Sequence, residues 1–170
     1  MEICFQLILD VSGSMRENYN SLINMANNII KKQQMNLENE GVVILFGTFA
    51  KAIINGKYRL LNVEDINLAR VLGGTNFYNA FSEARKYIHN KNNFTNKRIL
   101  FLTDGHADTS RLQSFCNEMI NEKFIINIVG FGSGHYFENL KQFASPNCFF
   151  SSTNFKEVEI FCQNAFAADY

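Results

Sequence analysis

The stretch ICFQLILDVSGS, residues 3–14, joins a nearly unbroken apolar run to a polar end that carries one carboxylate and two hydroxyls. The apolar part, 3–9, does not alternate with polar residues, which is typical of a strand that helices cover on both faces. Asp10, Ser12 and Ser14 follow at alternate positions as the chain leaves this strand. Their side chains can therefore converge on one point above the carboxyl end of the strand.

The rest of the chain alternates similar apolar runs with segments of helical period. Further runs lie at 41–49, 98–103 and 124–131, with a weaker one at 148–151. Apolar side chains spaced for one helix face start at Tyr19, Phe77, Leu112, Phe137 and Phe155. Strands that alternate with helices predict a parallel sheet covered on both faces. We therefore expect an α/β fold: a three-layer, Rossmann-like open sheet of six strands that is mostly parallel.

One interval breaks this alternation. After Phe49 the chain has no room for a crossover helix before the next apolar residues. Asn55-Gly56 is a turn signal, so we place a short antiparallel edge strand at 57–61, followed by a short helix at 63–71. The chain has one proline and no Ser/Gly-rich stretch that would mark a linker. Its 170 residues therefore fit a single domain, 1–170.

The composition excludes several classes of protein. Lys and Arg number 16 and balance 16 Asp and Glu, and zero net charge gives no electrostatic footprint for nucleic acid and no basic stripe for an anionic membrane. No apolar run approaches the roughly 20 residues that span a bilayer, and the first residues do not have a signal-peptide pattern. We therefore expect partners that are neither nucleic acid nor membrane, and a chain that is a monomer by itself.

The four cysteines, Cys4, Cys116, Cys148 and Cys162, are widely spaced and have apolar neighbours. They form no Cys-x-x-Cys pair and no Cys/His cluster of the kind that binds zinc. Reduced core thiols are the expected state, which is typical of a cytosolic protein. We expect a cytoplasmic location, or an extracellular one if the chain is a fragment cut from a longer protein.

Two further polar segments join the first one in the predicted sheet. GGTN at 73–76 directly precedes the helical stripe that starts at Phe77, and TDG at 103–105 follows the apolar run at 98–103. The glycines permit an unusual backbone path, and Thr75 offers a third hydroxyl at a helix entrance.

Asp10 and Asp104 are the two carboxylates of these segments. In open α/β sheets, ligands bind at the carboxyl ends of the strands where the winding reverses direction. If the two strands that carry them are neighbours there, the carboxylates face each other and repel unless a cation lies between them. Carboxylate and hydroxyl oxygens favour Mg²⁺ or Mn²⁺ over Zn²⁺.

At these three segments the sequence resembles the von Willebrand factor A domain (vWA) family and its metal-ion-dependent adhesion site (MIDAS). The resemblance covers nearly the whole chain, in the order of the family, and no element of the five-residue pattern is missing. It implies that Ser12, Ser14 and Thr75 are hydroxyl ligands and that Asp10 and Asp104 act mostly through bridging water. The implied cofactor is Mg²⁺, with Mn²⁺ or Ca²⁺ as alternatives.

The resemblance also implies a function. In this family a partner's Glu or Asp completes the coordination of the metal, so we expect a metal-dependent protein-protein interaction module without catalysis, working in an intracellular multiprotein assembly. Neutral hydroxyls leave the charge of the metal partly unquenched, which favours an acidic oxygen from outside. The residues expected on the partner-binding rim are Gly13, Gly74, Asn76, Phe77, Gly105 and His106.

A phosphoryl-transfer enzyme is the alternative. Asp10 would be the nucleophile of an aspartyl-phosphate enzyme, and Asp104 would hold Mg²⁺. Such enzymes generally need a second carboxylate two residues after the nucleophile and a lysine near the phosphate. Ser12 stands at the first of these positions, and Lys97 lies at the wrong end of its strand. A third hypothesis is a structural A domain whose metal is incidental.

Several smaller motifs have either a functional or an ordinary structural role. GFGSG at 130–134 lacks the Gly-x-Gly-x-x-Gly spacing of a dinucleotide fingerprint. His106 either contacts a partner or is an ordinary loop histidine. Residues 108–110 (DTS) are N-cap candidates for the next helix. Phe77 and Tyr78 are the aromatic residues that could flank the metal face.

Overall fold

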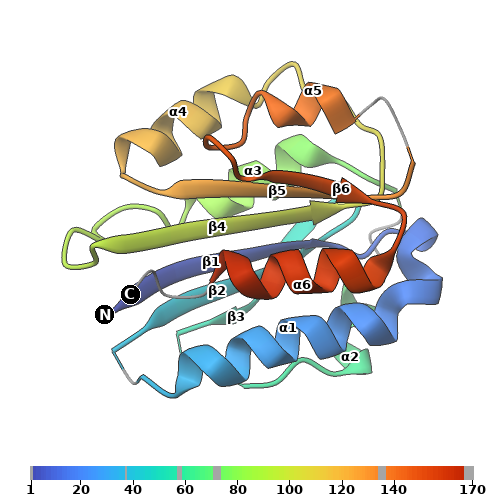
Figure 1. Ribbon diagram of the computed structural model, residues 1–170, viewed down its shortest axis with the longest axis horizontal. Coiled ribbons are helices and arrows are strands. Elements are labelled where there is room, and N and C mark those ends of the chain that lie inside the picture. The colour runs from blue at the N-terminus through green and yellow to red at the C-terminus, as the bar shows by residue number, and fades with distance from the viewer. Residues whose placement is uncertain (1, 37, 57–58, 71–73, 134–136, 167–170) are drawn as a thin grey trace.

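The computed structural model describes residues 2–36, 38–56, 59–70, 74–133 and 137–166, which form a sheet of six strands in the order β3-β2-β1-β4-β5-β6. β1 lies between β2 and β4, and every neighbouring pair is parallel except β2 and β3 (Figure 1). The expected α/β fold is confirmed. The strands are β1 (Ile3–Asp10), β2 (Glu40–Phe46), β3 (Ala50–Asn55), β4 (Asn96–Thr103), β5 (Ile125–Phe131) and β6 (Phe149–Ser152).

Helices cover both faces of this sheet. α1, α2 and α6 lie on one face, and α3, α4 and α5 lie on the other (Figure 1). The helices expected from apolar periodicity are all present, and of the short helix expected at 63–71 the last residue lies outside the described residues. The helical elements are η1 (Gly13–Asn18), α1 (Tyr19–Gln34), α2 (Val63–Arg70), α3 (Phe77–Arg85), α4 (Gln113–Asn121), α5 (Glu138–Lys141) and α6 (Phe155–Ala165).

β1 is buried along its whole length because helices pack on both its faces. Phe5, Leu7 and Leu9 belong to the core beneath α1 and α6, whereas Cys4 and Ile8 belong to the core beneath α3 and α4. Each large apolar side chain buried in this way contributes about 1.5–3 kcal/mol. The chain passes from β1 to β2 on one side and later returns to β4 on the other, so the winding reverses between β1 and β4. Such sheets generally bind ligands outside the carboxyl ends of the strands at this point.

Phe101 of β4 fixes α3 against the sheet. Its ring stacks on Phe46 of β2 at 5.3 Å, and the rings of Phe77 and Phe81 from α3 lie 5.3 and 4.9 Å away. Aromatic pairs at these distances stabilise beyond the area that they bury. Because Phe77 is the first residue of α3, this cluster also positions the segment at 74–76 that enters the helix.

The antiparallel edge strand lies earlier in the chain than the sequence interpretation placed it. β3 pairs with β2 through Ala50–Asn55, not through 57–61. β2 ends at Phe46, and residues 47–49 form a tight turn in which Gly47 N donates to Phe49 O at 2.9 Å. Of the segment expected to be the strand, 57–58 lie outside the described residues and 59–61 are not in a strand.

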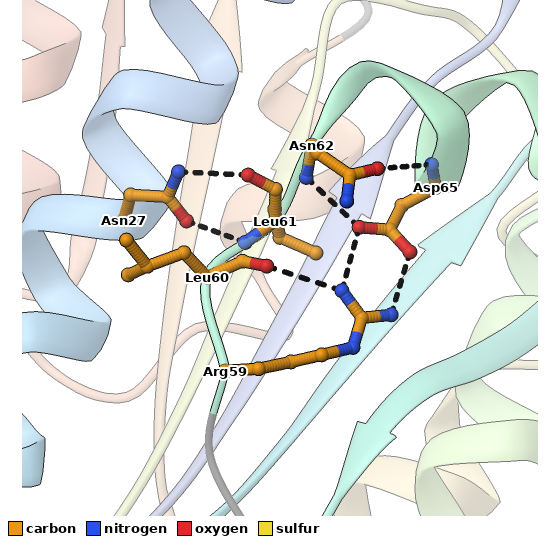
Figure 2. Close-up of polar contacts among 6 residues, drawn as sticks. All are labelled: Asn27, Arg59, Leu60, Leu61, Asn62 and Asp65. Carbon is orange, nitrogen blue, oxygen red and sulfur yellow. Dashed lines mark hydrogen bonds and ion pairs between the residues drawn. The ribbon is translucent and has the colours of Figure 1, made fainter.

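Polar contacts fasten the segment after β3 to α1 and α2 (Figure 2). The Asn27 amide of α1 donates to Leu61 O at 2.9 Å and accepts from Leu61 N at 2.7 Å. Arg59 donates two hydrogen bonds to the Asp65 carboxylate of α2, at 2.8 and 2.6 Å, and Asn62 N donates a third at 2.8 Å. Side chains rather than strand pairing therefore hold this segment in place.

The Asp65→Asn substitution should lower the free energy of unfolding by about 1 kcal/mol near neutral pH, because it removes charge-assisted bonds to a nearly buried group. The hydrogen bonds from Arg59 hold the pKa of Asp65 below its usual value of 3.8. Folding lowers this pKa, so the stability it confers is present above the unfolded pKa and is lost as the pH falls through the folded value. Urea unfolding should show a difference between the two proteins at about pH 7 that shrinks at about pH 2.5. A constant difference would contradict this account.

Cys4, Cys116, Cys148 and Cys162 are all free, as expected, and only Cys148 is not fully buried. Burial raises the pKa of Cys4 to about 11 and that of Cys116 to about 12, so these thiols are poor nucleophiles at neutral pH. In the described part of the chain, no helix combines the length and apolar character that crossing a membrane requires.

Candidate metal centre

The expected neighbours at the reversal of the winding are confirmed. β1 and β4 pair in parallel from Ile3↔Asn96 to Leu9↔Leu102. Asp10 is the last residue of β1, and Asp104 directly follows the end of β4. The two carboxylates therefore belong to the same edge of the sheet.

Asp10 is held rigidly at the base of this site. It is 0% exposed; its Oδ1 accepts from Ser12 N at 2.8 Å and its Oδ2 accepts from Thr103 Oγ1 at 2.6 Å. The same Thr103 hydroxyl accepts from Gly105 N at 3.0 Å. The buried Thr103 side chain thus orients the carboxylate of β1 and the loop after β4 together.

A chain of hydrogen bonds links the first polar segment to the second carboxylate. Ser14 Oγ donates to Asp104 Oδ1 at 2.9 Å, and Ser12 Oγ lies 3.1 Å from Ser14 Oγ. The backbone here makes a 3₁₀ turn, in which Met15 N donates to Ser12 O at 3.0 Å. The Tyr19 hydroxyl of α1 stabilises the turn by donating to Val11 O at 2.7 Å and to Ser12 O at 2.9 Å.

Thr75 joins the group from the third segment. A Cβ atom placed on Gly105 would lie 3.3 Å from Thr75 Oγ1 and 3.6 Å from Asp10 Oδ2, so both oxygens border the same small space. The next residue, Asn76, ties this segment to the loop after β2, because its N–H donates to Gly47 O at 2.8 Å. Its side chain caps α3 by accepting from Asn79 N at 2.9 Å.

The two carboxylates repel each other in the absence of a cation. Partial burial and, after it, the negative charge of Asp10 raise the pKa of Asp104 to about 6, although the hydrogen bond from Ser14 opposes the rise. Two acids and three hydroxyls form a set of hard oxygen donors, which is the chemistry that Mg²⁺ prefers. The described residues contain no group of three or more His, Cys, Asp or Glu side chains that could hold a metal.

The Gly105→Ala substitution should weaken Mg²⁺ binding about tenfold, because the added methyl group would press on the Thr75 hydroxyl beside Asp10. The matched control is Gly13→Ala, since a Cβ on Gly13 meets nothing within 4 Å. Isothermal titration of both variants with Mg²⁺ measures the effect. Equal affinities in the two variants would show that the space beside Gly105 does not matter for the metal.

The residues expected on the partner-binding rim differ in how exposed they are. Gly13, Gly74 and His106 are exposed, and Asn76 and Gly105 are half-buried. Gly73 of the GGTN motif, which was not expected on the rim, lies outside the described residues. Phe77 is a correction: it is 2% exposed and packs on the Phe101 cluster, so it is part of the core and not of the rim. A bulky apolar residue at the start of a helix is drawn inward by the burial of its ring.

Sequence reasoning missed two residues that support this site and one exposed residue in the turn after β2. Thr103 and Tyr19 were assigned to a strand end and a helix stripe, and only their hydroxyl contacts reveal their role. Phe49 was assigned to the end of a strand, yet it lies in the turn after β2 and is 59% exposed. A Cβ placed on Gly74 would lie 3.4 Å from Thr48 Oγ1 of the same turn. The glycine at 47 was the signal that could have ended the strand earlier.

Other candidates lie elsewhere or have structural roles. The Lys97 ammonium donates to Glu122 O at 2.8 Å, at the amino end of its strand. Residues 108–110 do not cap α4, whose N-cap is Leu112; instead Asp108 accepts from Ser110 N within the preceding turn. The loop at 130–134 lies partly outside the described residues.

Comparisons with known proteins agree with this architecture. The family model described as von Willebrand factor type A domain matches residues 5–106. Proximal thread matrix protein 1 of the mussel byssus, in a structure with a zinc-occupied MIDAS motif, superposes with a TM-score of 0.73 at 18% identity, over 96% of this chain and 44% of that one. The search of curated proteins gave no match.

Two bacterial structures share the fold at similarly low identity. The pilus adhesin SpaC from Lactobacillus rhamnosus GG, in an open conformation, has a TM-score of 0.70 at 14% identity, over 96% of this chain and 29% of that one. A von Willebrand factor type A protein from Catenulispora acidiphila has a TM-score of 0.66 at 15% identity, over 96% of this chain and 41% of that one. The chain thus spans less than half of each of these structures.

Proposed function

Because the chain belongs to the von Willebrand factor type A domain family, we propose that it is a metal-dependent protein-interaction module that binds a Glu or Asp carboxylate of a partner at a Mg²⁺ site. The observation that carries the proposal is the chain of contacts from Ser12 through Ser14 to Asp104, which meets Asp10 and Thr75 at one edge of the sheet. Three separate segments contribute to this one point.

The assigned metal-holding residues are Asp10, Ser12, Ser14, Thr75 and Asp104. The two carboxylates would attract a divalent ion, and the ion would relieve the repulsion between them. When bound, Mg²⁺ supplies an electrophilic centre for an acidic oxygen from outside. The neutral hydroxyls preserve that character, because they hold the ion without cancelling its charge. Mn²⁺ or Ca²⁺ has the same preference for oxygen ligands.

The residues around Asp10 favour a binding role over catalysis. An aspartyl-phosphate enzyme needs a carboxylate oxygen that is free to attack phosphorus. Both oxygens of Asp10 accept short hydrogen bonds, from Ser12 N and from Thr103 Oγ1, and the side chain is 0% exposed. The Lys97 ammonium, at the opposite end of β4, cannot serve the same site.

The partner-binding rim in this proposal consists of Gly13, Gly74, Asn76, Gly105 and His106, with Phe49 added. Phe49 is a large exposed ring in the turn after β2, and Gly47 O of the same turn accepts from Asn76 N. Exposed aromatic residues often anchor interfaces. We extend the proposal to an intracellular assembly, which the four unpaired cysteines support.

The experiment that tests the function is a pull-down from cell extract with the immobilised protein. A partner should be retained in millimolar Mg²⁺, released by EDTA, and retained again when Mg²⁺ is added in excess. Immobilised Asp10→Ala protein, which lacks one of the assigned metal-holding residues, is the comparison for the wild type. A retained set that is the same in Mg²⁺ and EDTA would contradict metal-dependent binding.

Incubation with a small phosphodonor such as acetyl phosphate tests the enzyme alternative. We expect no increase in mass of the intact protein in Mg²⁺. A stable acyl phosphate on Asp10, found by mass spectrometry of the peptide that contains it, would support the alternative instead.

A further inference from the structure

A small cavity opens beside the candidate metal centre, between the start of α3 and the loop before α4. Its volume is about 200 Å³, and its walls include Thr75, Asn76, Tyr78, Asp108 and Arg111. Thr75 therefore borders both the metal centre and the cavity. A partner segment whose acid lies on the metal would carry its neighbouring residues across this cavity.

Arg111 places a positive charge on the cavity wall. Its guanidinium lies over the Tyr78 ring, 3.9 Å from the ring centroid, and the Tyr78 ring packs on Phe115 at 5.2 Å. A cation–π contact of this kind orients the guanidinium without neutralising it. Arg111 is exposed, and no ion pair joins it to a carboxylate of the described residues. Its N–H groups can therefore donate to an acid that enters the cavity.

We propose that this cavity is a second recognition site for the partner, in which Arg111 binds a second carboxylate of the same segment. The inference rests on the proposed function, since the first acid of the segment is the one at the metal. The expected partner is an acidic peptide segment with two acids a few residues apart, not a single exposed Glu. Pairs between guanidinium and carboxylate are charge-assisted and directional, so this site selects among acidic partners.

Asp108 limits how strongly the cavity attracts an acid. Its carboxylate accepts a hydrogen bond from Ser110 N at 2.9 Å. This bond, together with the charge of Arg111, keeps the pKa of Asp108 below its usual value. Asp108 is therefore ionised beside Arg111 at neutral pH. Removing its charge should strengthen the binding of a second acid, which makes a gain of affinity available as a test.

The test uses synthetic peptides and the whole chain. One fluorescent peptide carries a single Glu in a Gly/Ser background, and a series adds a second Glu at each successive position on either side. Dissociation constants are measured in millimolar Mg²⁺ and in EDTA. For the wild-type protein, the best two-acid peptide should bind about fivefold more tightly than the single-acid peptide.

Four variants test whether the ratio of the two dissociation constants, single-acid peptide over two-acid peptide, depends on the cavity. In Arg111→Gln the ratio should fall to near one, and in Asp108→Asn it should rise. Lys31→Gln removes an exposed charge in the last turn of α1, and here the wild-type ratio should persist. Arg111→Glu should reverse the preference, in favour of a peptide with Lys at the second position.

The outcomes separate this inference from the proposed function. A ratio near one for wild type at every spacing, or an undiminished ratio in Arg111→Gln, overturns the second site. In that case Mg²⁺-dependent binding of the single-acid peptide still upholds the proposed function. If no peptide binds in Mg²⁺, the proposed function and the second site both fail.

Discussion

The Asp10→Asn protein should lose nearly all of the thermal stabilisation that Mg²⁺ gives to the wild type. With Mg²⁺ at about 100 times its dissociation constant, the free energy of unfolding of the wild type should rise by about 2.7 kcal/mol, or roughly 5–10 °C for a chain of this size. Asparagine has the size of Asp10 but loses its charge and one acceptor for the bonds from Ser12 N and Thr103 Oγ1. Metal affinity should therefore fall about 100-fold.

Thermal unfolding followed by circular dichroism, at increasing Mg²⁺, measures this effect. Glu64→Gln is the control, because it removes one exposed carboxylate in the first turn of α2. That variant should gain the same stability from Mg²⁺ as the wild type. If Asp10→Asn gains as much as Glu64→Gln, the ion stabilises the protein from some other place.

Replacing Asp104 with asparagine should have opposite effects on stability without and with the metal. Burial and, after it, the negative charge of Asp10 raise the pKa of Asp104, so its ionised carboxylate is unfavourable in the metal-free protein. Removing that charge should stabilise the metal-free protein by about 1 kcal/mol after allowance for solvent screening, or about 2–4 °C. In saturating Mg²⁺ the order should reverse, because only the wild type keeps both acids for the ion.

The comparison is made at about pH 8, which is above the raised pKa of Asp104. Glu138→Gln, at an exposed position in α5, controls for the loss of one negative charge. Its stability relative to wild type should not depend on Mg²⁺. A metal-free Asp104→Asn protein that is less stable than wild type would contradict this prediction. It would show that Asp104 stabilises the fold through its hydrogen bond with Ser14.

The sequence was sufficient to predict the fold class because the strands of the buried centre are unmistakable. A run such as 98–103 can be buried on both faces only in a sheet that helices cover on both sides. The edge strand was misplaced, since the apolar run at 41–49 reads as continuous. In the structure the strand of this run ends before Gly47. The Gly47 N–H donates to Phe49 O, and Gly47 O accepts from Asn76 N, which is 29 positions away in the chain. Contacts over such distances leave no local pattern.

The proximity of the three motifs could be predicted from the sequence, whereas the contacts that support them could not. Ser14 and Asp104 were expected to converge, and they share a hydrogen bond. The role of Thr103 depends on a rotamer that turns its hydroxyl toward Asp10, and nothing in the motif specifies a rotamer. Phe77 was misplaced for a related reason, because its position beside Thr75 did not reveal that its ring turns toward Phe101.

Water-proton relaxation with Mn²⁺ in place of Mg²⁺ addresses the whole account in one measurement. Bound Mn²⁺ that keeps an exchangeable water should enhance relaxation, and a Glu-containing peptide should reduce the enhancement by displacing that water, whereas the matching Gln peptide should not. The enhancement should be absent in the Asp10→Asn protein. No enhancement with the wild type, or an enhancement that the Glu and Gln peptides affect equally, would contradict a metal that accepts a partner's acid.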